Sequence, residues 1–284
     1  MIWTIKEKSL YWAIKNGPIS EIIKAIQNGA DVNARDIEDR TPLMYACRCN
    51  ASKEVIELLI AKGAKVNAKE KVGWTPLMFA CDSEASKEVI EVLINNKAKV
   101  NKKSNHGRTP LMYACDNPKN VTLEIIQLLL DHGAYINAKD EDDWTPLMYA
   151  CERNASKEVI ELLIAKGAKV NAKDKVGRTP LMLAKEFNAS KGVIELLKKA
   201  QFATLEADLA KSEQKNAKLK ANLSKSEQKK ATLKANLAKS KQENANLQQK
   251  IDEQNAQIAY NNFQAKKREQ QRKRDLMLGR LRHK

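Results

Sequence analysis

The chain has 284 residues, of which 43% are apolar, 30% charged and 5% aromatic. No run of 18 apolar residues and no basic segment followed by an apolar core is present, so we expect neither a transmembrane helix nor a signal peptide. Five cysteines, an odd number in a long chain, are typical of reduced thiols in a cytoplasmic protein.

The net charge of +16 is unevenly distributed along the chain. Residues 1–200 carry a net charge of +5, whereas residues 201–284 carry +11. This asymmetry indicates two parts with different chemistry.

Internal repeats organise the first part. A Thr-Pro-Leu-Met string recurs at spacings of 34, 34, 36 and 34 residues and begins at Thr41, Thr75, Thr109, Thr145 and Thr179. An asparagine stands eight residues before each of these threonines, at Asn33, Asn67, Asn101, Asn137 and Asn171. The constant distance predicts a connecting turn of constant geometry, with insertions tolerated elsewhere in the unit.

Each unit contains the signals of two short helices. In the second unit, residues 41–47 begin with a proline next to a threonine, which suits a helix start because the missing N–H costs nothing there. Residues 52–60 carry an apolar i, i+3, i+4 stripe behind a capping serine. Gly63 follows as the expected left-handed helix end.

These residues resemble the ankyrin repeat, whose pattern is Gly-x-Thr-Pro-Leu-His-x-Ala followed by Leu-Leu-x-x-Gly-Ala-x-x-Asn. The resemblance covers residues 5–200 and implies an all-α solenoid of helix-turn-helix units with hairpin-like turns, built to bind proteins. It implies about six units, which are residues 5–36 as an N-terminal cap, 37–70, 71–104, 105–140, 141–174, and 175–200 as a C-terminal cap. The family's histidine is methionine in all five Thr-Pro copies, so its hydrogen bond to the threonine hydroxyl should be lost.

Residues 201–260 have a period of 14, which is two heptads. With Leu205 at position d, leucine and isoleucine recur at a and d, but alternate heptads carry serine at d and asparagine or lysine at a. Such polar residues favour two strands. We expect a long helical coiled coil that pairs the chain in parallel, as a homodimer; the alternative is a solvated or partly disordered tract.

The final segment, residues 261–284, is a basic tail. Its cations include Lys266, Lys267, Arg268, Arg272, Lys273 and Arg274. It could bind nucleic acid or an anionic membrane surface, or act only as a solubilising end.

Chemistry that would indicate an enzyme is missing from the sequence. The three histidines have no metal-ligand or nucleophile spacing, and no phosphate-binding glycine loop is present. Cys47, Cys81, Cys115 and Cys151 occupy the same place in successive units, so we expect buried packing residues, and Cys49 adds too little for a zinc site. We expect no catalytic residue, metal, cofactor or small-molecule substrate.

Two columns of residues recur in phase and are the candidate partner-binding site. The first precedes each Thr-Pro and consists of Arg40, Trp74, Arg108, Trp144 and Arg178. The second lies in the first helices and consists of Tyr45, Phe79, Tyr113 and Tyr149, with Trp12 in the equivalent place of the first unit. The resemblance implies that both border a concave face, and arginine and aromatic residues are enriched at interaction hot spots. The alternative for the second column is that its rings only pad the inner helices.

The function expected from the sequence is a protein-binding adaptor or scaffold. The alternatives are a tether to nucleic acid or to an anionic membrane through the basic tail, and a bacterial effector that acts in a host cell.

Overall fold

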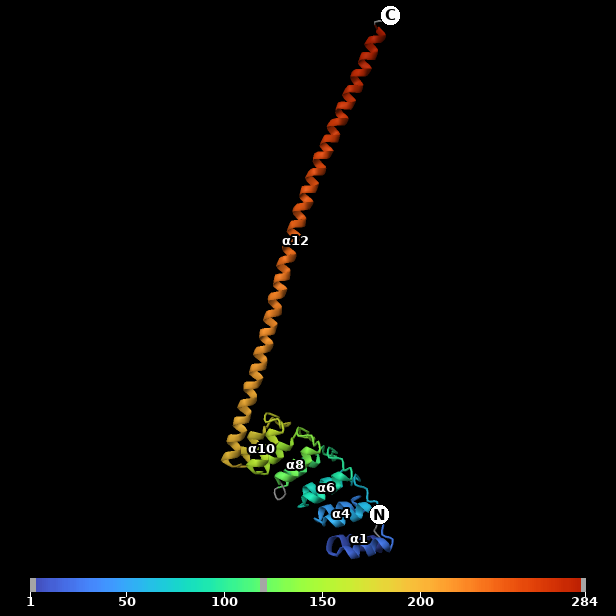
Figure 1. Cartoon of the computed structure of the whole chain (residues 1–284), viewed down its shortest axis with the longest axis vertical. Coiled ribbons are helices and arrows are strands. Elements are labelled where there is room, and N and C mark those ends of the chain that lie inside the picture. Colours follow the sequence, from blue (N-terminus) through green and yellow to red (C-terminus); the bar gives the residue numbers. More distant parts are fainter. Residues whose placement is uncertain (1–3, 118–121, 282–284) are drawn as a thin grey trace. The chain divides into compact units, whose positions relative to one another are not determined.

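The computed structural model of the chain describes residues 4–117 and 122–281, with side chains of the last helix described to residue 274 (Figure 1). The chain divides into two units, Met1–Ala207 and Asp208–Lys284. No strand occurs in the described ranges, which confirms the all-α class.

The helices of the first unit come in pairs along the chain, and the pairs stack in chain order (Figure 1). The first pair is α1 (Ile5–Asn16) and α2 (Ile19–Gln27). The following pairs are α3 (Pro42–Arg48) with α4 (Lys53–Ala61), α5 (Pro76–Asp82) with α6 (Lys87–Asn95), α7 (Pro110–Asp116) with α8 (Leu123–Asp131), and α9 (Pro146–Glu152) with α10 (Lys157–Ala165). The first helices pack on one another in one layer and the second helices in another. The buried core runs through both layers.

The last pair is α11 (Pro180–Glu186) and the beginning of α12 (Lys191–Leu281). Val193 and Leu197 of α12 are buried in the repeat core, as the second helix of a repeat requires. With no proline or helix-ending glycine after them, the helix continues as one element of 91 residues. The long helix is therefore confirmed, whereas its pairing with another helix stays a prediction.

The methionines replace the family's histidine in an unexpected way. In four units the backbone N–H of the threonine faces the methionine Sδ at 3.3–3.4 Å, and the methionine is fully buried. Sulfur is only a weak acceptor, so packing carries most of the stabilisation. Met182 of the last unit is 54% exposed and lacks this contact among the described bonds.

The asparagines eight residues before each Thr-Pro join successive repeats. Each side-chain amide donates to the carbonyl at the helix end of the next unit and accepts from a backbone N–H two residues further on, over 2.7–2.9 Å. The bonded asparagines are Asn33, Asn67, Asn101 and Asn137. Asn171 Oδ1 is buried without a partner, because α12 takes the place of the unit that would supply one.

Candidate functional site

The residue before each Thr-Pro is held by a turn with its own side-chain acceptor, which is buried in four turns and partly buried in the turn of Asp140. In the turn between the first and second units, the Asp36 carboxylate accepts the backbone N–H groups of Glu38 at 2.8 Å and Arg40 at 2.7 Å. The equivalent acceptors in the other units are Glu70, Ser104, Asp140 and Asp174. These bonds give every turn the same shape, so the column residues leave the backbone at equivalent places in all units.

Successive turns also bond directly to each other. The Asn105 backbone N–H donates to the Val72 carbonyl at 2.9 Å, and three other pairs of turns make the same contact. Gly107 has φ +77°, and a Cβ there would lie 3.0 Å from the backbone of Asp140 in the next turn. Glycine is thus required at this position both by the left-handed backbone and by the approach of the neighbouring turn.

Residues of both predicted columns form one continuous stack of rings and guanidinium groups, which we call the ladder. It consists of Trp74, Phe79, Arg108, Tyr113, Trp144, Tyr149 and Arg178. The Trp74 ring lies 5.0 Å from Phe79 of its own unit and 4.2 Å from Tyr113 of the next, measured between centroids. The Arg108 guanidinium carbon lies 4.6 Å from the Tyr113 centroid and 4.2 Å from that of Tyr149.

The ladder continues into the last unit. Trp144 packs on Tyr149 at 5.0 Å, and Arg178 lies over Trp144 at 5.3 Å. Every unit from the third to the last thus contributes a side chain that touches a neighbouring unit.

Burial separates the two columns. Phe79, Tyr113 and Tyr149 are at most 9% exposed, whereas Trp74, Trp144 and the arginines are only partly buried. Burial also raises the pKa of Tyr149, whose hydroxyl donates to Asp140 at 2.5 Å. These buried rings form the inner part of the ladder, and the tryptophan and arginine side chains form its accessible surface.

At the N-terminal end, Arg40 and Tyr45 are placed differently. The Tyr45 ring packs edge-on against Tyr11 at 4.6 Å, and Tyr11 donates to the carbonyl of Arg40 at 2.8 Å. Trp12, which the sequence places at the equivalent position of the second column, is 59% exposed. Helix α1 presents Tyr11 to the second unit instead.

An ion cluster lies beside the middle of the ladder. Asp116, whose side chain is 14% exposed, pairs with Arg108 of its own unit and with Arg153 of the next at 2.6 Å. Asp82 occupies the position equivalent to Asp116 in the preceding unit, and burial raises the pKa of the Asp82 carboxyl group. Asp116 thereby holds the Arg108 guanidinium against the rings.

A cavity of about 490 Å3 opens at the N-terminal half of the ladder, and we call it the basic cavity. Arg40, Arg48 and Arg108 contribute cations to its lining, and Trp74 contributes its ring. One of its two carboxylates, Glu70, is occupied by backbone N–H groups of its own turn.

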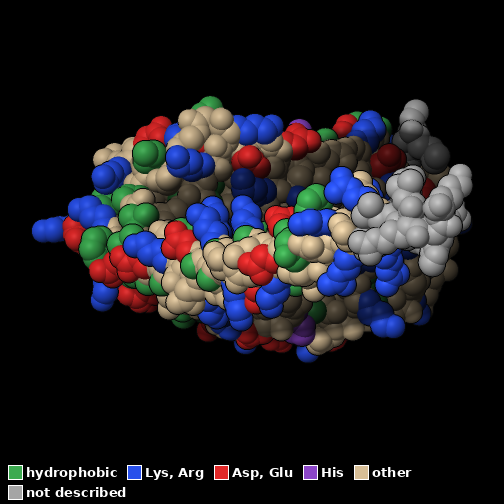
Figure 2. All heavy atoms as spheres, turned by 90° about the horizontal axis from the view of Figure 1, so that it is seen from above, with side chains coloured by type: hydrophobic (Ala, Val, Ile, Leu, Met, Phe, Trp, Pro, Cys, Tyr) green, Lys and Arg blue, Asp and Glu red, His purple; other side chains and the backbone are tan. Residues whose placement is uncertain are grey.

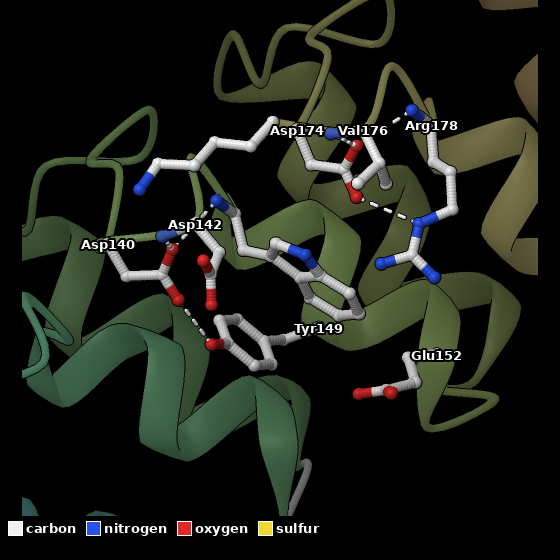
Figure 3. A pocket seen from close by; sticks show the side chains of 9 residues that line it. Asp140, Asp142, Tyr149, Glu152, Asp174, Val176 and Arg178 are labelled. Atoms are coloured by element: carbon white, nitrogen blue, oxygen red, sulfur yellow. Dashed lines mark hydrogen bonds and ion pairs between the residues drawn. The ribbon is translucent and has the colours of Figure 1, made fainter.

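A second cavity of about 320 Å3, the acidic cavity, opens at the C-terminal half (Figure 3). Asp140 and Asp174 are engaged by Tyr149 and Arg178, while Asp142 and Glu152 also line the space. Burial raises the pKa of Glu152. The two cavities therefore differ in the sign of the charge that they present.

The predicted basic side chains of the tail lie on α12. All six, from Lys266 to Arg274, are exposed, and Lys273 pairs with Glu269 at 2.8 Å. On the face in Figure 2, lysine and arginine side chains are interspersed with acidic ones. Residues 282–284 of the predicted tail lie outside the described residues.

The cysteines sit where the repeat period predicts. Cys47, Cys81, Cys115 and Cys151 are buried, and burial raises their thiol pKa values, to about 12 for Cys151, whereas Cys49 is exposed. Over residues 4–117 and 122–281, no group of three or more potential metal ligands is present. No helix in these ranges is long and apolar enough to span a membrane.

Two sets of residues at this site were missed from the sequence. One is the side-chain acceptor four residues before each residue of the first column. The other is the ionic position seven residues after each Thr-Pro threonine, which contains Asp82, Asp116 and Glu152. Their constant offsets within the repeat are the signal that could have identified them.

Comparison with protein families agrees with the geometry. The model for ankyrin repeats matches three overlapping segments, residues 10–104, 69–140 and 122–207. Among curated proteins, no significant match to the chain is found.

Proposed function

The chain belongs to the ankyrin-repeat family, and from this premise we propose that it is a non-enzymatic scaffold whose ladder binds a segment of a protein partner. The observation that carries the proposal is the partly exposed Trp74, Arg108, Trp144 and Arg178 surface on a rigid, buried support. Tryptophan and arginine residues held in place in this way lose little conformational entropy on binding, and they are enriched at hot spots.

The charges beside the ladder define the kind of segment that fits. The basic cavity suits a carboxylate of the partner, and the acidic cavity suits a lysine or arginine. Apolar or aromatic side chains between them would contact the tryptophans. A segment with this patterned charge is favoured over a uniform polyanion, which the acidic cavity would repel.

Site-specific photo-crosslinking tests this proposal. A photoreactive phenylalanine derivative replaces Trp74 or Trp144 in the full chain, and a matched control replaces Tyr135, which is 66% exposed and lines neither cavity. We expect a protein to be captured from a lysate at positions 74 and 144 and not at 135.

The captured protein is then purified and its affinity measured against folded variants. Trp144→Ala should weaken binding by at least tenfold, since a hot-spot side chain contributes about 2 kcal/mol or more, and Tyr135→Ala should leave it unchanged. Equal affinities of these two variants for the partner would contradict the proposal.

We further propose that α12 dimerises the chain. Leucine and isoleucine recur at heptad positions from Leu205 to Ile258, and these side chains are 48–69% exposed in the single chain. Such a regular apolar seam is stable in water when a second helix covers it. Two linked repeat arrays would raise the avidity for a partner that has two copies of the segment.

The exposed cations from Lys266 to Arg274 support a second candidate, a tether to nucleic acid or an anionic membrane. Such binding falls steeply with salt, because bound counterions are released. Loss of binding on removal of residues 264–284, with ladder variants unaffected, would favour the tether over the scaffold.

A further inference from the structure

We propose that α12 pairs with α12 of a second copy of this chain in antiparallel orientation, with the twofold axis near Gln228. This inference rests on the self-association proposed above and adds its direction and register. It replaces the parallel pairing expected from polar residues in the seam. Three features of the described helix carry it, namely the spacing of the apolar layers, the place of Lys230, and the flanking charges.

The leucine and isoleucine residues at positions a and d from Leu205 to Ile251 are symmetric about Gln228, whereas Phe202 and Ile258 lie outside the symmetric set. In an antiparallel pair, position a of one helix faces position d of the other, so residues whose numbers are equally far from 228 meet. The resulting contacts between the two copies are Leu205 with Ile251, Leu209 with Leu247, Leu219 with Leu237, and Leu223 with Leu233. Each occurs twice by symmetry, and all eight of these side chains are exposed in the single chain.

The register follows from the same pattern. A slip by one 14-residue period would keep leucine opposite leucine, but it would leave two of the eight apolar layers without an apolar partner. Of these antiparallel alignments, the one about Gln228 therefore buries more apolar area.

Lys230 distinguishes the two orientations. It occupies position a, where a parallel in-register pair would place the two Lys230 side chains against each other in the seam. In the antiparallel pair it faces Ser226 of the second copy, a small hydroxyl residue that leaves room for the ammonium group to reach water. Antiparallel pairing thus removes this repulsion between two Lys230 side chains within the seam.

Flanking charges act in the same direction. In a parallel pair, position g faces position e five residues on in the second copy, which joins Asp208 with Glu213, Lys215 with Lys220, and Lys229 with Lys234. All three pairs repel, and no other g–e pair between residues 201 and 255 joins opposite charges.

In the antiparallel pair, g faces g and e faces e. The charged contacts then include Asp208 with Lys250, Lys215 with Glu243, and Glu213 with Lys241, each formed twice. Like charges meet only near the axis, as Lys220 with Lys234 and as the self-pairs of Glu227 and Lys229. Attractive contacts therefore outnumber repulsive ones, whereas the parallel pair has only repulsive ones.

Cysteine cross-linking of the full chain tests the orientation. All variants carry Cys49→Ser, because Cys49 is exposed, while the other cysteines are buried and their raised pKa values make them unreactive. Ser212→Cys and Asn244→Cys are prepared as separate proteins. These positions face each other in the antiparallel pair but lie about 48 Å apart in the parallel pair.

We expect disulfide dimers only when the two proteins are mixed, allowed to exchange and oxidised. Ala217→Cys, on the outer side of the helix at heptad position b, serves as the control and should not cross-link with either. Dimers formed by Ser212→Cys alone would show parallel pairing and overturn the inference. A monomer in sedimentation velocity would overturn it together with self-association, while photo-crosslinking at Trp74 still tests the ladder separately.

Charge reversal gives a second measurement. Lys250→Glu should raise the dissociation constant of the dimer about tenfold, because two attractive pairs become repulsive, and addition of Asp208→Lys should restore it. In a parallel pair Lys250 faces Asn255, so an unchanged dissociation constant would contradict the antiparallel arrangement.

Discussion

The guanidinium carbon of Arg108 lies 4.2 Å from the ring centroid of Tyr149, which belongs to the following repeat. Asp116 pairs with the same guanidinium and also with Arg153, so one ion cluster joins two neighbouring units. In a repeat protein, stability is the sum of the units and of the interfaces between neighbours. The interface that Arg108 spans is therefore part of the fold as well as of the candidate site.

Replacement of Arg108 tests this double role. Arg108→Lys keeps the charge but loses the planar group that stacks on rings. We expect the free energy of unfolding, measured in urea, to fall by about 1 kcal/mol. A double-mutant cycle with Tyr149→Leu, the residue type found at Leu183 in the next unit, should give a coupling of about 0.5–1 kcal/mol. Arg48→Lys, at an exposed arginine of the second unit, is the control. Additive effects of Arg108 and Tyr149 would show that their contact contributes nothing.

The hydrogen bonds of the repeat asparagines predict that alanine substitution lowers stability by different amounts at equivalent positions. Asn101→Ala removes bonds to the Gly133 carbonyl and the Tyr135 N–H, and it should destabilise the chain by about 1–2 kcal/mol. Asn171→Ala removes an oxygen that is buried without a partner, and the cost should be near zero or negative. Denaturant unfolding measures both, and equal losses would contradict the assigned role.

Glycines in equivalent turns should also differ. Gly107→Ala combines a left-handed backbone with a contact of 3.0 Å to the next turn, whereas Gly177 has nothing within 4 Å of the added Cβ. Backbone strain of about 1 kcal/mol applies to both. We expect Gly107→Ala to lose at least about 1 kcal/mol more than Gly177→Ala in the same unfolding assay, because the backbone of the next turn must move. Equal losses would mean that the turns do not pack as described.

Substitution of two glutamates should change the stability of the fold in opposite directions as pH varies. Burial raises the pKa of Glu152, so its ionised form weakens the fold as pH rises through that pKa, and Glu152→Gln should gain a few tenths of a kcal/mol at pH 7. The gain should vanish below about pH 4, where the carboxyl is protonated in the folded and unfolded chain alike.

Glu158 is the matched control for this measurement. Backbone and Ser156 hydrogen bonds at the start of α10 lower its pKa, so its ionised form stabilises the fold above the ordinary pKa. Glu158→Gln should therefore lose stability at pH 7, and the loss should fade as pH falls through the lowered pKa. Melting temperatures between pH 3 and pH 8 report both effects, and the same sign for both variants would contradict the burial of Glu152.

Much of the fold was predictable because its signals are local. The cap at Thr41, the proline after it and the left-handed Gly63 act within a few residues of one another, and each repeat states them again. Asp39, Lys97 and Asp143 stand where other units have glycine, and they also adopt positive φ. The buried cysteines followed from the period alone.

The accessible surface of the site was less predictable. Both columns were visible in the sequence, but their burial depends on rings from neighbouring units, 34 or more residues away. Tyr113 is covered by Trp74 and Arg108, whereas no local feature distinguishes it from an exposed tyrosine. Likewise, the ring of the buried Tyr11 packs on Tyr45, whereas Trp12 is exposed.

The sequence by itself therefore determined the repeat, its family and the columns that could meet a partner, because turn shape and helix capping are set within about ten residues. Only the tertiary structure decided that the columns merge into a ladder, that tryptophan and arginine form its surface, and that cavities of opposite charge flank it. Those properties arise from side-chain packing and desolvation between units, which depend on distances that a repeat period does not contain.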